Sequence, residues 1–182
     1  SAIGSARWYW AWSLLLLGVA AVLGGIDHGL MESGEATGEI TMLTRPTWLV
    51  LGLMTLTVLL TLARQYFHGR GFRVVVGLAA IQFAVFAACL PFVQTFLVVM
   101  VNYGAAIILL LVLNMMHLKS GKGSWQMVLG IAIMLLASAV QATGVDAFPL
   151  LDHNGLYHVI AMLGIPLLYL GGVRLGNPGI SR

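Results

Sequence analysis

The longest uncharged stretch of the chain, residues 74–116, limits its fold more than any other feature. Its 43 residues contain no acidic, basic or histidine side chain. As one helix, at about 1.5 Å per residue, it would reach about 65 Å, twice the thickness of a hydrocarbon core of about 30 Å. The stretch must therefore reverse direction. Pro91 marks the expected position, because proline interrupts helix hydrogen bonding and restricts the residue before it. We expect two helices that form a tight hairpin there.

Composition excludes most other classes of protein. Apolar residues make up 60% and charged residues 8% of the 182 residues, against about 45–50% and about 25% in soluble domains. So little polar surface excludes a soluble enzyme, a disordered chain and a disulfide-rich module, and the scattered basic residues do not indicate a nucleic-acid partner. The sequence predicts an all-α polytopic membrane protein: a six-helix transmembrane bundle with short loops, forming a single transmembrane domain over 1–182. Its helices are expected at about 8–30, 46–66, 73–90, 92–117, 124–144 and 153–174.

Charged residues divide unequally between the two sets of loops that six alternating helices create. One set, together with both termini, contains eight of the nine basic residues, whereas the other contains all six acids and only Arg45. Cytoplasmic loops of membrane proteins are enriched in lysine and arginine. The predicted localisation is therefore an integral, multi-pass membrane protein with its N- and C-termini in the cytoplasm.

Acidic and histidine side chains gather at the predicted outer ends of the first and last helices. The first of these segments is GGIDHGLMESG, residues 24–34, and the second is LDHNGLYH, residues 151–158. Ionisable groups at membrane depth are costly and usually serve a function, and imidazole and carboxylate groups are the ligands that suit zinc. We expect the two segments to converge near the outer face and to bind a divalent metal, with a metal-free histidine–carboxylate cluster as the alternative.

The same two segments resemble motifs of the CREST superfamily, which includes alkaline ceramidases and adiponectin-receptor-like membrane hydrolases. Residues Gly24 to His28 are similar to its first motif, with glycine in place of serine. Residues His153 to His158 are similar to its second, with one additional residue between the histidines. The resemblance implies a hydrolase with zinc held by His28, His153 and His158, and Asp27 beside the catalytic water.

Four further side chains are candidates to surround the zinc ligands and hydrogen-bond to them. They lie near the same predicted face and can accept or donate hydrogen bonds: Glu32, Gln141, Asp152 and Asn154. A structural role is open for two of them, because Asp152 or Asn154 would also suit the N-cap of the last helix. Polar residues within the spans are expected to form hydrogen bonds between helices; these are Gln82, Asn102, Asn114, Ser138 and Gln141.

Several functions remain open from the residues alone. The first is a zinc-dependent hydrolase that acts on an amide or ester bond of a lipid, with membrane lipids as partners and substrate. The others are a transporter or proton-relay module, a non-catalytic accessory subunit of a membrane complex, and haem ligation by His28 and His158. An oligomer or partner subunits are compatible with each of these functions.

Overall fold

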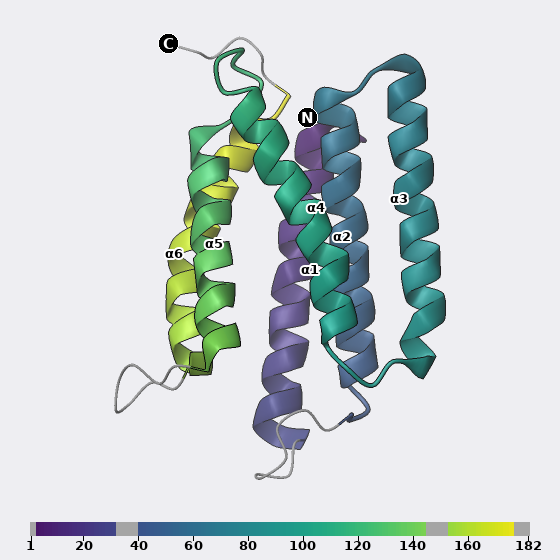
Figure 1. The fold of residues 1–182 in the computed structure, drawn as a ribbon, viewed down its shortest axis with the longest axis vertical. Coiled ribbons are helices and arrows are strands. Elements are labelled where there is room, and N and C mark those ends of the chain that lie inside the picture. Colours follow the sequence, from purple (N-terminus) through teal and green to yellow (C-terminus); the bar gives the residue numbers. More distant parts are fainter. Residues whose placement is uncertain (1–2, 32–39, 145–152, 177–182) are drawn as a thin grey trace. The chain divides into compact units, whose positions relative to one another are not determined.

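The computed structural model describes residues 3–31, 40–144 and 153–176, and this part of the chain contains helices and no strand. Figure 1 shows the six α-helices, which run Ala6–Ile26 (α1), Thr44–Tyr66 (α2), Gly69–Cys89 (α3), Leu97–Met116 (α4), Trp125–Thr143 (α5) and His153–Arg174 (α6). A π-helical segment, Asp27–Met31, extends α1, and a 3-10 turn, Leu90–Phe92, follows α3. The predicted all-α fold with six helices is confirmed, with helix ends displaced by a few residues.

Six helices in the described residues are long and apolar enough to cross a membrane, with lengths of 19 to 24 residues. A hydrocarbon core of about 30 Å requires about 20 such residues. Helices are expected in this setting because each helix hydrogen-bonds its own backbone polar groups. The hydrocarbon core of a membrane offers these groups no partner. The chain therefore has the architecture of a multi-pass membrane protein.

The fold consists of two compact units, residues 1–110 and 111–182, and α4 contributes to both. The first unit contains α1, α2, α3 and most of α4. The second contains the end of α4 with α5 and α6. The prediction of a single transmembrane domain over 1–182 is not tested by this division and stays a prediction.

Within the first unit, α2 packs against both α1 and α3. The Ser13 hydroxyl on α1 donates to the Thr57 hydroxyl on α2 over 2.9 Å. On its other side, α2 presents Gly52 to Phe86 of α3, where an added Cβ would lie only 2.5 Å from the phenylalanine ring. The α2–α3 contact therefore depends on the absence of a side chain at Gly52.

The predicted reversal at Pro91 is confirmed, but the predicted tight hairpin is wrong, because α3 and α4 do not pack closely along their lengths. Helix α3 ends at Cys89, Pro91 lies within the 3-10 turn, and α4 begins at Leu97, so no continuous helix passes through this region. Beside the turn, Trp48, Phe86, Leu90 and Val99 form a buried cluster. Proline thus interrupts the helix at this point, and the turn that follows packs against α2.

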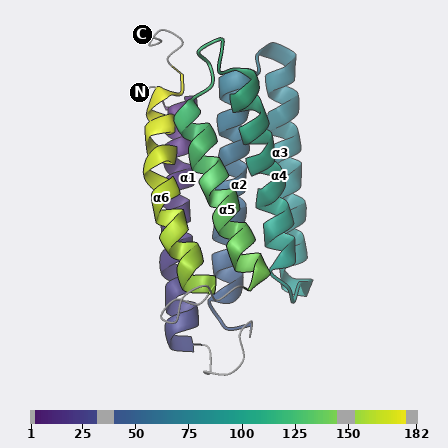
Figure 2. The same cartoon turned by 60° about the vertical axis from the view of Figure 1, so that its left-hand side comes forward.

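The second unit is a close-packed helical hairpin. Figure 2 shows α5 and α6 side by side over their length. Glycines allow this approach: a Cβ on Gly171 would lie 2.8 Å from the backbone nitrogen of Met127, and one on Gly130 would lie 2.9 Å from Leu168. Small residues at helix contacts are typical of membrane bundles, where van der Waals packing drives association.

Candidate functional site

The C-terminal end of α1 buries a carboxylate. Helix α1 ends at Ile26, and Asp27 begins the π-helical segment with only 4% of its surface exposed. Single-turn π segments within helices are often found at functional sites. The adjacent His28 is exposed. This end of α1 therefore places a buried acid beside an exposed imidazole.

Two threonine hydroxyls at the start of α2 hold the Asp27 carboxylate. Thr44 donates to Oδ2 over 2.9 Å, and Thr41 donates to Oδ1. Each hydroxyl in turn accepts a backbone N–H, from Thr41 to Thr44 over 2.9 Å and from Leu43 to Thr41 over 3.1 Å. These backbone donors occupy a lone pair of each hydroxyl, which leaves the hydroxyl protons free to point at Asp27. Both carboxylate oxygens therefore act as hydrogen-bond acceptors.

This network joins the C-terminal end of α1 to the start of α2. Both Asp27 and Thr44 are buried, and a buried polar group is stabilised only when it is hydrogen-bonded. The network is therefore a structural link, whether or not Asp27 has a further role. The prediction that Asp27 is catalytic stays a prediction, because the described contacts neither place it beside a metal-bound water nor test that role.

The three predicted zinc ligands are divided between the two units. His28 belongs to the first unit, whereas His153 and His158 belong to the second. Helix α6 begins at His153, and the exposed His158 packs its ring against Tyr157 with 4.9 Å between the ring centroids. The side chain of His153 lies outside the described residues. Among the residues that are described, no three His, Cys, Asp or Glu side chains form a group that could hold a metal ion. Convergence of these histidines, zinc binding and haem binding stay predictions.

The four side chains expected around the zinc ligands also stay a prediction. Gln141 is exposed in the last turn of α5. Asn154 is the second residue of α6, but its side chain is not described. Glu32 and Asp152 both lie outside the described residues.

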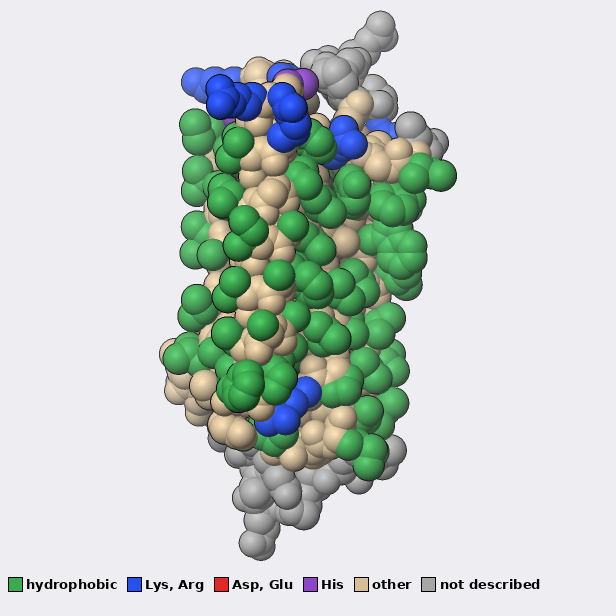
Figure 3. Space-filling model, turned by 90° about the vertical axis from the view of Figure 1, so that its right-hand side faces the viewer, with side chains coloured by type: hydrophobic (Ala, Val, Ile, Leu, Met, Phe, Trp, Pro, Cys, Tyr) green, Lys and Arg blue, Asp and Glu red, His purple; other side chains and the backbone are tan. Residues whose placement is uncertain are grey.

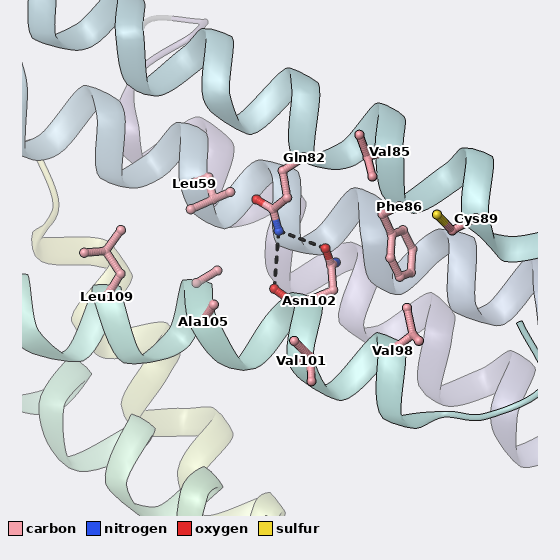
Figure 4. A pocket seen from close by; sticks show the side chains of 11 residues that line it. Leu59, Gln82, Val85, Phe86, Cys89, Val98, Val101, Asn102, Ala105 and Leu109 are labelled. Atoms are coloured by element: carbon pink, nitrogen blue, oxygen red, sulfur yellow. Dashed lines mark hydrogen bonds between the residues drawn. The ribbon is translucent and has the colours of Figure 1, made fainter.

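A second candidate site lies within the first unit, between α3 and α4. It is a cavity of about 560 Å³, and Figure 4 shows the side chains around it. Ligand sites typically enclose about 300–1,000 Å³ and combine apolar walls with a few polar groups. The cavity has this volume and apolar walls with one pair of amides, but it is open to the surface and not enclosed. Its lining residues are Leu59, Gln82, Val85, Phe86, Cys89, Val98, Val101, Asn102, Ala105, Ala106 and Leu109.

The amide pair joins α3 to α4 across the cavity. The Gln82 side-chain nitrogen donates to the Asn102 side-chain oxygen over 2.8 Å and lies 3.4 Å from the Asn102 backbone oxygen. The predicted interhelical hydrogen bonding of these two residues is confirmed. The contacts leave the Gln82 Oε1 acceptor and the Asn102 Nδ2 donor without a partner among the described residues. The pair can therefore offer one acceptor and one donor to a ligand.

Sequence reasoning did not identify this cavity, although a signal for it exists. Gln82 lies nine residues before Pro91 and Asn102 eleven residues after it. A reversal at Pro91 brings two positions at such similar spacing to similar depth, so their pairing could have been predicted. The space beside them depends on the small side chains of Ala105 and Ala106, whose orientation the sequence does not give.

Comparison with protein families places the chain in one of them. The model of DUF6962, a family of unknown function, matches residues 3–177, so the protein belongs to that family. No curated protein and no solved structure matches the chain. These comparisons do not bear on the resemblance to the CREST superfamily, which stays a prediction together with the hydrolase, transporter and accessory-subunit hypotheses.

Replacing Thr44 by valine should destabilise the first unit while keeping the shape of the side chain. The variant removes the hydroxyl that donates to Asp27 Oδ2, and leaving a buried acceptor without its donor costs about 1–3 kcal/mol. The measurement is the free energy of unfolding in detergent micelles. Thr143→Val is the matched control, because its exposed hydroxyl bonds only to the Val140 carbonyl of its own helix. Equal stability of the two variants would show that the Asp27 network is not a structural link.

Metal analysis of the purified protein tests the predicted zinc site. Convergence of the three histidines predicts about one zinc per chain, lost in both His28→Ala and His158→Ala. His68→Ala is the control, because this exposed histidine immediately precedes α3. Neutral imidazole is the metal-binding form, so zinc retention should weaken in acid. Zinc-free protein from a metal-replete preparation, or equal loss in the His68 variant, would contradict the prediction.

Proposed function

We propose that this member of DUF6962 is a multi-pass membrane protein that binds an acyl chain of a membrane lipid in the α3–α4 cavity. The observation that carries the proposal is the cavity itself, with its apolar walls and single amide pair. Lipid binding is the part of the sequence-based hydrolase hypothesis that this geometry supports. The proposal does not depend on whether the bound lipid is then hydrolysed.

The length of the cavity supports an acyl chain as the occupant. Its α4 lining extends from Val98 to Leu109, which corresponds to about 16 Å along the helix axis. This is about half of a 30 Å hydrocarbon core, or the depth of one leaflet. A chain from a single leaflet can therefore lie along α4.

The distribution of exposure around the cavity supports entry from the bilayer. Leu59, Phe86 and Ala106 are buried and form the floor, with 9%, 4% and 3% of their surfaces exposed. At the rim, Val85 and Val101 are 57% and 65% exposed. In a membrane, such exposed apolar side chains face lipid. A lipid chain can thus reach the floor without passing through water.

The amide pair supports recognition of a polar group on that lipid. Gln82 Oε1 can accept a hydrogen bond and Asn102 Nδ2 can donate one, while the Gln82–Asn102 bond holds both amides in place. A polar atom in hydrocarbon is costly unless it is hydrogen-bonded. A carbonyl, hydroxyl or amide near the acyl chain would satisfy the pair, whereas a plain hydrocarbon would not.

We also propose that both termini face the cytoplasm. The support is the division of eight basic residues on one predicted side from six acids on the other. The exposed Arg70 and Arg73, in the first turns of α3, belong to the basic side. They lie at the same end of the first unit as the start of α1.

Labelling of intact cells with an impermeant maleimide tests this orientation. Single cysteines are introduced at two exposed positions in a Cys89→Ser background: Met42→Cys before α2, and Ser120→Cys between α4 and α5. The cysteine at position 42 should react, and the one at 120 should react only after the cells are lysed. The opposite pattern would contradict cytoplasmic termini.

Filling the cavity should remove the bound lipid. The wild-type protein should retain a lipid through detergent exchange, whereas Ala105→Phe should weaken retention about tenfold, the equivalent of about 1.4 kcal/mol. The measurement is native mass spectrometry of the purified protein. Ile108→Phe is the matched control, because Ile108 is an exposed residue of the same helix that does not line the cavity.

Cys89 provides a second measurement, since the chain's single cysteine lines the cavity and is exposed. Removal of lipid should accelerate its reaction with maleimide, and added lipid should slow the reaction again. Equal lipid retention in the two phenylalanine variants, together with lipid-independent labelling of Cys89, would overturn the proposal.

A further inference from the structure

Three arginines gather where α2 ends and α3 begins. Arg64 lies in the last turn of α2, and Arg70 and Arg73 lie in the first turns of α3. All three side chains are exposed. Figure 3 shows basic side chains at one end of the face that α3 presents, above a surface covered by hydrophobic side chains. We call these three residues the α2–α3 arginine corner.

The described part of the first unit provides no carboxylate near this corner. All six acids of the chain lie within residues 27–39 and 146–152, so residues 40–145 contain none. The one acid of this unit that the structure describes is Asp27, at the opposite end of α1 and held by threonines. The corner therefore has a positive charge that the described residues around it do not balance.

The corner has a defined geometry. The Arg64 guanidinium carbon lies 4.3 Å from the centroid of the Phe72 ring, so a cation–π contact holds Arg64 of α2 against the start of α3. Arg70 and Arg73 are three residues apart, which places them about 60° apart around the helix and thus on one face. The two helices together present three guanidinium groups at one end of two apolar spans.

We propose that the α2–α3 arginine corner binds the phosphate of an anionic membrane lipid. Guanidinium groups form paired hydrogen bonds with phosphate oxygens, which suits arginine better than lysine to this role. The corner lies where two membrane-length helices end, which is the depth of lipid headgroups. This inference is independent of the α3–α4 cavity and of which side of the membrane the corner occupies.

Titration of the full-length protein in detergent, followed by native mass spectrometry, tests the corner. The probes are phosphatidylglycerol and phosphatidylcholine; both carry one phosphate, but the choline cation makes the phosphatidylcholine headgroup neutral overall. The wild-type protein should bind phosphatidylglycerol about tenfold more tightly, and salt should weaken this preference because the groups are exposed. In the double variant Arg70→Gln, Arg73→Gln the preference should be lost.

The matched control is the double variant Lys119→Gln, Lys122→Gln. It also removes two positive charges, from exposed positions in the α4–α5 connection on the same predicted side of the membrane. A specific corner predicts that this control keeps the preference for phosphatidylglycerol. An equal loss of the phosphatidylglycerol preference in the two double variants would show that only the overall charge of the protein matters. That result would overturn the proposal.

Inorganic phosphate distinguishes a lipid site from a general anion site. At millimolar concentration and constant ionic strength, phosphate should leave phosphatidylglycerol binding unchanged, because the acyl chains of the lipid also contact the apolar spans. Displacement of the lipid by phosphate would assign the corner to a soluble anion instead.

Discussion

Hydrocarbon offers the backbone no hydrogen-bond partner, and this constraint determines the rest of the structure. Each apolar segment pairs its own backbone groups by forming a helix, so the few polar side chains remain available to link one helix to another. Ser13 and Thr57 link α1 to α2, and Gln82 and Asn102 link α3 to α4. Apolar side chains gain little by exchanging lipid for one another, so polar links and close glycine contacts determine which helices pair.

The number and approximate positions of the helices could be predicted because they depend on where the uncharged apolar runs lie, on how long these runs are and on Pro91. A run of 43 uncharged residues cannot cross a membrane once, and Pro91 is the proline within it. Both the reversal and the pairing of polar residues across it follow from that arithmetic and are found in the structure. The extension of α1 by a π-helical segment could not be predicted, because the apolar pattern does not distinguish it from an α-helix.

The partners of the candidate site residues could not be predicted, because they depend on side-chain direction. The sequence places Asp27 beside His28, but its described partners are Thr41 and Thr44, which are 14 and 17 residues further along the chain. Threonine is common in membrane helices and often bonds to its own backbone, as Thr47 does here. Sequence alone therefore gave no reason to select the two threonines that hold the carboxylate.

The two polar sites of the first unit differ in how far their hydrogen-bonding capacity is used. At Asp27 both carboxylate oxygens accept hydroxyl donors, and each hydroxyl also accepts a backbone N–H, so the network is connected within the protein. At Gln82 and Asn102 one interhelical bond fixes the two amides, while one acceptor and one donor remain beside a cavity of about 560 Å³. A molecule that fits such a site needs a polar group to hydrogen-bond the amides and an apolar part to fill the cavity. The cavity is thus better suited than the Asp27 network to bind a lipid.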